Sequence, residues 1–345
     1  MASLKDVARR AGVSVSTVSH VINGYDDISE STRRKVLQAI RELNYHPNSI
    51  ARNLLLQRSH TVGVVTVGQQ SISHPLFNQL IVALAAAVEE ADLGIALTVY
   101  DPEADSVDGC LQRWHEQRLE GIVVIGMAEE SPLVQAVARS KIPAVFVDTQ
   151  ASGPKATWIA SDNRQGAYEA VTHLLRLGHR KIAFLQGVPN GRIIRDRYEG
   201  YKQALQDAGL PADDTLYEQA DFTKEGAYRA AERLFARTVP TAIFCVSDLM
   251  AFGVMQWARD KGIAVPDGLA VVGFDDDPAS EHVTPALTTV RQSGYEMGLA
   301  AARSLLQLIE ENTPADPITL PTRLVVRASC GAPGRARTES QQASA

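Results

Sequence analysis

Residues 3–23 read SLKDVARRAGVSVSTVSHVIN, which predicts two short helices joined by a tight turn. Four residues of the first helix recur with helical spacing and form one apolar face: Leu4, Val7, Ala8 and Ala11. Ser3 can cap this helix, and Asp6 lies near its positive end. Gly12 permits the backbone geometry of the turn. The stretch is therefore a candidate helix-turn-helix.

The second helix has an inward and an outward face. Ser14 is its expected cap, and Val18, Val21 and Ile22 point inward. The outward residues are small, mostly polar and nearly uncharged: Val15, Ser16, Thr17, Ser19 and His20. Such a face can approach base edges in the major groove of DNA. The alternative is an ordinary solvated helix face.

Three segments carry a resemblance to a known family: Lys5–Ala8, Ala11–Ser14 and Thr17–Asn23. They resemble the headpiece of the lactose-repressor/galactose-repressor family of bacterial transcription regulators. Within that family, Thr17–Asn23 is most similar to the recognition helix of the purine repressor. The resemblance extends to about Cys330, and it implies that the outward residues of the second helix, together with Asn23, contact DNA.

A third helix is predicted from near Ser29 or Ser31, with Val36, Ile40 and Leu43 on its inner face. Three helices enclose only a small core, which Tyr45 is expected to complete.

Residues 49–56 read SIARNLLL and predict a fourth helix, although eight residues are too few to stay helical alone in water. The segment could simply pack on its own core domain. In the family that the chain resembles, it is the hinge helix, which orders on DNA, pairs with its copy in the dimer and inserts a leucine into the minor groove. Leu54 matches that leucine, and Arg52 precedes it.

The charge of the chain is unevenly distributed. The net charge is −6, but the first sixty residues hold nine Lys/Arg and five Asp/Glu, and the remainder holds 25 and 35. A basic head on an acidic body indicates that the head alone meets phosphates. The three scattered cysteines, the lack of a secretory signal and the lack of a long apolar run predict a cytoplasmic protein without a membrane contact.

From residue 61 the sequence alternates apolar strands with helices. The predicted strands are 62–67, 95–100, 121–125, 144–147, 181–185, 242–246 and 270–274, and the helices include 76–91, 163–177, 196–208 and 249–262. This alternation predicts parallel sheets covered on both faces, in two doubly wound α/β subdomains. The resemblance implies the periplasmic sugar-binding fold, in which the chain crosses between the subdomains near Ala160, Arg291 and Leu320.

These observations predict four regions along the chain. They are a helix-turn-helix headpiece (1–46), a hinge and linker (47–60), an effector-binding and dimerisation core (61–330) and a disordered tail (331–345). The core divides into an N-subdomain (about 61–160 plus 291–320) and a C-subdomain (about 161–290 plus 321–330).

Ligands of open α/β sheets bind beyond the carboxyl ends of the strands. Arg197 heads the sequence RYEGY, which matches a motif of the family, and its guanidinium can hold hydroxyls or a carboxylate. Asp275 in GFDD matches the aspartate of the family's cleft. A structural ion pair, for example between these two residues, is the alternative.

The resemblance implies five further effector contacts: His74, Phe77, Asp148, Phe222 and Ser247. Ser247 stands where the lactose-type members have asparagine. A core role is the alternative for Phe77, and an exposed position in a loop is the alternative for His74. Helix capping explains Asp162 and Asn163 adequately.

Two differences from the purine repressor argue against a purine as the effector. Thr149 stands in place of the purine repressor's stacking tryptophan, and Gly191 stands in place of its arginine. A sugar or sugar derivative is therefore favoured. Arg192 and Arg195 add positive charge nearby, which leaves a phosphorylated or acidic sugar as an alternative.

The sequence contains no phosphate-binding loop, no nucleophile elbow and no metal-ligand spacing, so we expect no enzymatic activity, no catalytic residue, no cofactor and no metal. A solute-binding transport protein is the other rival class, and the basic head argues against it. We predict a ligand-controlled repressor that binds a palindromic operator as a homodimer, because one headpiece makes too few contacts for specificity. The apolar helices from Leu76 and from Leu249 are the expected dimer interface.

Overall fold

The computed structural model describes residues 2–22, 28–45, 59–68, 72, 74–187, 191–311, 313 and 315–331. The chain divides into two compact units, residues 1–59 and residues 60–345. The predicted hinge helix, with Arg52 and Leu54, lies outside the described residues, as do Asn23 and the tail beyond Gly331.

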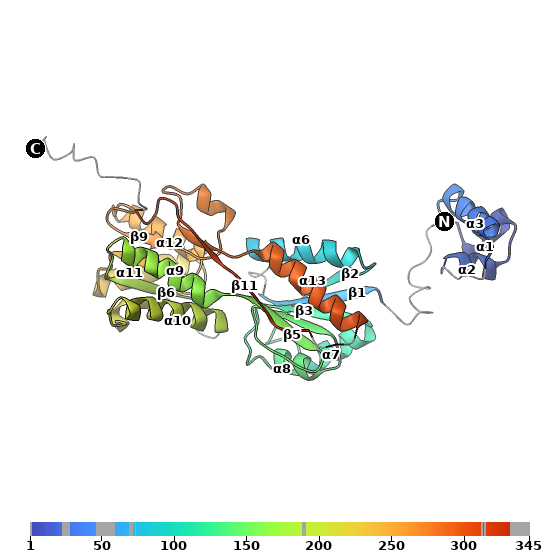
Figure 1. Ribbon diagram of the computed structural model, residues 1–345, viewed down its shortest axis with the longest axis horizontal. Helices are drawn as coiled ribbons and strands as arrows, with labels where there is room; N and C mark the ends of the chain where they lie inside the picture. The colour runs from blue at the N-terminus through green and yellow to red at the C-terminus, as the bar shows by residue number, and fades with distance from the viewer. Residues whose placement is uncertain are drawn as a thin grey trace, which may run out of the picture. The chain divides into compact units, whose positions relative to one another are not determined.

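The described residues of the first unit form three helices: α1 (Leu4–Ala11), α2 (Val15–Ile22) and α3 (Glu30–Glu42) (Figure 1). Ser3 caps α1 in a capping box with Asp6, and Gly12 ends it in the left-handed conformation at φ 67°. The backbone N–H of Thr17 donates to Ser14 Oγ at 3.0 Å, which caps α2. These features confirm the predicted helix-turn-helix.

Apolar side chains from all three helices form the core of the headpiece. Val7, Val18 and Val36 are fully buried, and Tyr45 packs against them as predicted. Ser29 caps α3, which confirms the first of the two predicted starts.

The N-terminal lobe of the second unit is built on a six-stranded parallel sheet with the order β11-β5-β4-β3-β1-β2. Its strands are β1 (Thr61–Val67), β2 (Gly94–Tyr100), β3 (Gly121–Ile125), β4 (Ala144–Val147), β5 (Ala156–Ser161) and β11 (Ile318–Leu320). Helices α6 (Pro75–Glu89) and α13 (Gly294–Glu310) run side by side and share one apolar core with the sheet (Figure 1). Helices α7 (Val107–Glu116) and α8 (Pro132–Arg139) share a second core with it.

The C-terminal lobe is built on a four-stranded parallel sheet with the order β7-β6-β8-β9. Its strands are β6 (Ile182–Gln186), β7 (Tyr217–Gln219), β8 (Ala242–Cys245) and β9 (Ala270–Val272). Its helices pack in two pairs, α9 (Asn163–Arg176) with α10 (Arg192–Asp207) and α11 (Lys224–Arg237) with α12 (Asp248–Asp260). Two short 3-10 helices, Asp214–Leu216 and Pro278–Glu281, lie in its loops.

The chain passes from one lobe to the other after β5, after β10 (Thr289–Arg291) and after β11. Strand β10 lies just before the second passage, and β12 (Arg323–Val325) lies just after the third. The two strands pair in an antiparallel ribbon. The predicted α/β class with two parallel sheets is confirmed.

Two details differ from the sequence prediction. The prediction omitted β5, β7, β11 and the ribbon of β10 and β12, and these strands are short or only partly apolar. Helix α10 begins at Arg192 rather than Asp196, because Ile194 is buried in the lobe's core and extends the apolar face of the helix.

Candidate functional site

The outward face of α2 is the candidate DNA interface. Val15 is 40% exposed and Ser16 is also exposed, while the other predicted contacts Thr17, Ser19 and His20 are half-buried. Ser14 Oγ lies 2.8 Å from Thr17 Oγ1, so the hydroxyl of Thr17 takes part in the cap of the helix. The face that protrudes furthest therefore includes Val15 and Ser16.

The second candidate site lies where the two lobes meet, and we call it the interlobe cluster: His74, Asp148, Arg197 and Asp275. Arg197 extends from α10 and is only 4% exposed. Its Cζ atom lies 3.6 Å from the centroid of the Phe274 ring, and its Nη2 atom lies 3.9 Å from Asp275 Oδ1. The pairing that the sequence left open as an alternative is thus present in the structure.

Asn163 orients Arg197, because its Oδ1 atom accepts a hydrogen bond from Arg197 Nε at 2.8 Å. Arg197 Nη1 also donates to the carbonyl of Val246. Sequence reasoning treated Asn163 as part of a helix start, and only Asp162 has that role: its Oδ1 accepts from the backbone N–H of Gln165 at 3.0 Å. Sequence reasoning therefore missed Asn163 as a residue that positions the Arg197 side chain in the candidate site.

Asp275 follows β9 with a left-handed backbone (φ 123°). Gln292, from the passage between β10 and α13, donates to Asp275 Oδ1 at 2.6 Å. The other oxygen, Oδ2, lies 3.3 Å from His74 Nε2. Asp275 is therefore held by its own lobe and by the opposite lobe, and Gln292 is the second contact that sequence reasoning missed.

His74 is not the exposed loop residue that the sequence offered as an alternative. It caps α6, because its Nδ1 atom accepts from the backbone N–H of Leu76 at 3.3 Å. Nε2 then carries the proton that faces Asp275. Burial lowers the pKa of His74, but the hydrogen bond and negative charge of Asp275 outweigh it, so that its pKa lies above the ordinary value.

Asp148 follows β4 and also has a left-handed backbone (φ 58°). Burial raises the pKa of its carboxyl to about 6, although the positive charge of Arg197 acts in the opposite direction. Its Oδ1 atom is buried and has no hydrogen-bond partner among the described residues. The hydroxyl of neighbouring Thr149 is already used, because it donates to the carbonyl of Met127 at 2.6 Å.

The three remaining predicted contacts have structural roles as well. Phe77 is 6% exposed and belongs to the core under α6. Ser247 is buried and caps α12 by accepting from the backbone N–H of Met250 at 3.3 Å. Phe222 has φ 62° and lies against Gly187, where an added Cβ would stand 2.3 Å from the ring.

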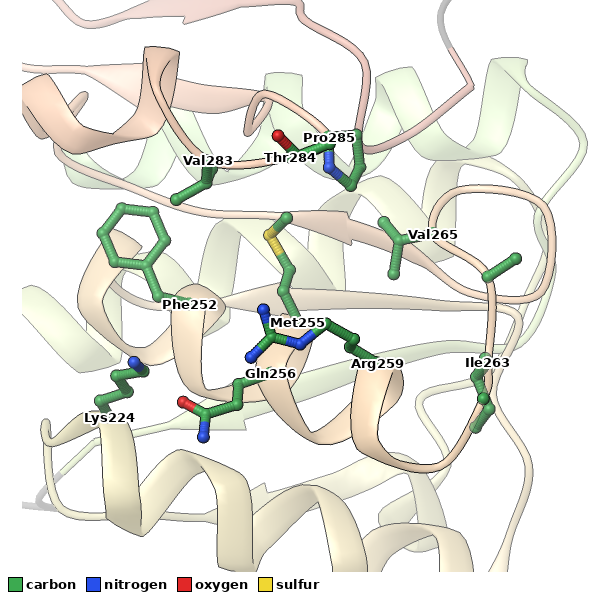
Figure 2. Close-up of a pocket in the computed structure, with 12 residues that line it drawn as sticks. Lys224, Phe252, Met255, Gln256, Arg259, Ile263, Val265, Val283, Thr284 and Pro285 are labelled. Atoms are coloured by element: carbon green, nitrogen blue, oxygen red, sulfur yellow. The ribbon is translucent and has the colours of Figure 1, made fainter.

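A separate pocket of about 580 Å³ lies on the C-terminal lobe (Figure 2). It is formed by α12, the segment 262–265 and the segment 283–285. Phe252, Met255 and Val283 line it with apolar surface, and Lys224 and Arg259 stand at its side. None of the interlobe cluster lines this pocket.

Within the described ranges, no group of three or more His, Cys, Asp or Glu residues is placed to hold a metal ion. A search of the same part of the chain finds no helix with the length and apolarity needed to cross a membrane.

Comparison with known proteins gives two family matches. Residues 3–48 match the family described as bacterial regulatory proteins, lacI family. Residues 171–330 match the periplasmic binding protein-like domain.

Two relatives align with nearly the whole chain. Catabolite control protein A of Priestia megaterium is 34% identical over 330 residues, which cover 95% of this chain and 98% of that protein. The HTH-type transcriptional repressor PurR of Photobacterium profundum is 33% identical over 336 residues, with the same coverages.

Two solved structures share the fold over the same length. The lac repressor dimer bound to operator and the anti-inducer ONPF has a TM-score of 0.83 and 28% identity, and the match covers 95% of this chain and 99% of that chain. The transcriptional regulator CelR–cellobiose complex has a TM-score of 0.73 and 30% identity, and the match covers 95% of this chain and 100% of that chain.

Proposed function

The chain belongs to the lacI family of bacterial regulatory proteins, and we propose that a sugar or sugar derivative, bound between the two lobes of its core, controls its affinity for operator DNA. It is a DNA-binding transcriptional repressor with a helix-turn-helix head and an effector-binding core. Residues 1–46 read the operator, residues 47–60 form the hinge, and residues 61–330 bind the effector and a second copy of the chain. Its site of action is the cytoplasm, and it catalyses no reaction.

The interlobe cluster is the main support for a sugar effector. It brings a guanidinium, an imidazole and two carboxylates together from both lobes. Sugar hydroxyls can donate to carboxylates and accept from a guanidinium at the same time. The buried Oδ1 of Asp148 offers an acceptor with no partner in the described structure, and the half-buried ring of Phe222 offers an apolar wall for the C–H face of a sugar.

An uncharged sugar fits this environment better than an acidic one. Arg192 and Arg195, which suggested an acidic effector at first, both pair with Glu129 across the lobes. Arg192 also lies 3.4 Å from Asp196. The positive charges of Arg192 and Arg195 are therefore balanced, and the guanidinium of Arg197 already pairs with Asp275.

The test is operator binding in the presence of a panel of small molecules. Operators are first selected from random DNA with the full chain, and their affinity is then measured with neutral sugars, phosphorylated sugars, sugar acids and purine bases. We expect a neutral sugar to change operator affinity by about 5- to 150-fold. Asp275→Asn should bind operator but lose the response. A response to purine bases or anionic sugars alone would overturn the sugar proposal.

We further propose that a second copy of the chain packs on α6 and α12. Apolar side chains are exposed on both helices, including Val82 at 64% and Leu249 at 40%. The pocket of Figure 2 lies on the same helix α12 and is lined by apolar side chains. Exposed apolar patches of this kind favour a protein partner. Leu249→Glu should shift the chain towards the monomer in sedimentation, and an unchanged dimer would contradict this placement.

A further inference from the structure

Four charged side chains join the two lobes outside the interlobe cluster. Glu129 and Glu130 belong to the N-terminal lobe, between β3 and α8, while Arg192 and Arg195 lie at the start of α10 in the C-terminal lobe. Arg195 Nη2 lies 3.3 Å from Glu129 Oε2, and Arg195 Nη1 lies 3.5 Å from Glu130 Oε1. Arg192 Nε lies 4.0 Å from Glu129 Oε1. We call these four residues the clasp.

Each side of the clasp is held in place by its own lobe. Glu129 Oε1 accepts from the backbone N–H of Gln150 at 3.3 Å, and the Glu129 carbonyl accepts from Gln135 Nε2 at 2.8 Å. On the other side, Asp196 lies 3.4 Å from Arg192 Nε. Because these local contacts fix the charged groups, the ion pairs between the lobes lose less side-chain entropy when they form.

The clasp connects the two segments that carry the candidate effector contacts. Gln150, whose N–H reaches Glu129, comes directly after Asp148 and Thr149. Arg192 and Arg195 lie within the same first turns of α10 as Arg197. A movement that separates the lobes must therefore break the ion pairs of Glu129 and change the spacing between Asp148 and Arg197.

We propose that Glu129 and Glu130, together with Arg192 and Arg195, form an electrostatic clasp that favours the closed arrangement of the lobes before any effector is bound. This inference rests on the proposed effector site. The clasp would determine how much of the effector-free protein has closed lobes. A ligand can shift a two-state equilibrium only by its differential affinity for the two states. The clasp therefore determines how much of that differential affinity is needed for a full response.

The solvent exposure of the clasp side chains determines how strongly they favour the closed lobes. Glu129 is 21% exposed and Arg195 is 50% exposed, so water and salt screen the pairs in part. Pairs of this kind shift an equilibrium by about two- to fivefold. This is smaller than the roughly 5- to 150-fold range of allosteric couplings, so that an effector can override the clasp.

The experiment measures the distance between the lobes directly, in the full chain and without any added ligand. Spin labels are attached at Gln117→Cys in the N-terminal lobe and Gln206→Cys in the C-terminal lobe, and pulsed dipolar spectroscopy gives the distance distribution. The native cysteines are all buried, so that labelling is selective. We expect Glu129→Gln, which keeps the shape of the side chain, to increase the separated fraction about two- to fivefold.

Four further samples test whether the change in distance comes from the clasp: a second single variant, the double variant, a control variant and the parent protein at high salt. Arg195→Gln should act like Glu129→Gln, and the double variant should open less than the product of the two single effects, since both remove one shared contact. Glu116→Gln removes an exposed charge on α7 that pairs only locally with Gln112, and it should leave the distances unchanged. High salt should mimic Glu129→Gln in the parent protein.

An unchanged distance distribution in Glu129→Gln, with the melting temperature of the parent, overturns the clasp. Fully independent effects of the two single variants overturn it as well. Because neither measurement uses operator or effector, such a result leaves the proposed function standing, whereas failure of the sugar panel leaves the clasp standing.

Discussion

His74 Nε2 lies 3.3 Å from Asp275 Oδ2, although the two residues belong to different lobes. The contact therefore joins the two lobes at one carboxylate oxygen of the interlobe cluster. Since His74 Nδ1 is occupied by the backbone N–H of Leu76, the ring cannot turn away without uncapping α6.

The first prediction concerns the pH dependence of this contact. The pKa of His74 is raised in the folded protein by Asp275. Its stabilising effect is therefore complete below the ordinary histidine pKa of about 6.5 and is lost as the pH rises through the raised value. His74→Asn can still cap α6 but is too short to reach Asp275. It should lower the melting temperature more at pH 6 than at pH 8.5, where the neutral ring still donates to Asp275 through Nε2–H, and this difference should correspond to at most about 1 kcal/mol.

The control for this prediction is His115→Asn, because His115 is exposed on α7. Its melting temperature should follow that of the parent at every pH. If His74→Asn and the parent differ by the same amount at pH 6 and pH 8.5, the protonated contact does not stabilise the closed lobes.

The second prediction concerns Asp148, whose pKa burial raises to about 6. A carboxyl with a raised pKa opposes folding once it is ionised, so its effect is absent well below pH 4 and complete above about pH 6. Asp148→Asn should therefore stabilise the protein at pH 8 by roughly 2–3 kcal/mol and leave stability at pH 3.5 almost unchanged. Asparagine tolerates the left-handed backbone of this position. Urea unfolding at the two pH values decides the matter, and equal stabilisation at both would rule out ionisation as the cause.

The sequence predicts those contacts of the structure that join residues close together in the chain. The caps at Ser3 and Ser14 and the buried strands followed from neighbouring residues and apolar runs. Asn163 and Gln292 gave no such signal, because each acts on a residue far away in the sequence. The same reason explains why Arg195 suggested an acidic ligand: its partner Glu129 comes from the other lobe.

The third prediction concerns the space beside Phe222. A Cβ at Gly187 would lie 2.3 Å from the Phe222 ring, so the ring must move in Gly187→Ala. We expect a loss of about 1–3 kcal/mol in stability, which is typical of overpacking, together with a weaker response to the effector found in the sugar panel. Gly191→Ala is the matched control, because a Cβ added at Gly191 would have no atom of the described residues within 4 Å. Equal melting temperatures for the two variants would show that Phe222 is not fixed by this contact.

The fourth prediction concerns the DNA-reading face of α2. His20→Ala should relax the base preference at one operator position, since a well-placed side-chain contact to a base edge contributes about 1–3 kcal/mol of discrimination. Gln38→Ala is the control, because Gln38 is exposed on α3, outside the predicted DNA contacts, and donates to Glu42 on the same helix. Selection from randomised half-sites measures the preference. If His20→Ala keeps the parent's preference at every position, His20 makes no base contact.

The last prediction concerns Leu54, which lies in the segment that the family resemblance assigns to the hinge. If this leucine enters the minor groove, Leu54→Ala removes a buried apolar side chain worth about 1.5–3 kcal/mol from the complex with DNA. Operator affinity should then fall by roughly ten- to a hundredfold, while calorimetry with the effector gives the parent's affinity. Leu56→Ala removes the same number of atoms two residues further along the chain and should cost less. An operator affinity that Leu54→Ala leaves unchanged, or that the two variants lower equally, would mean that the segment acts through general packing rather than through one inserted side chain.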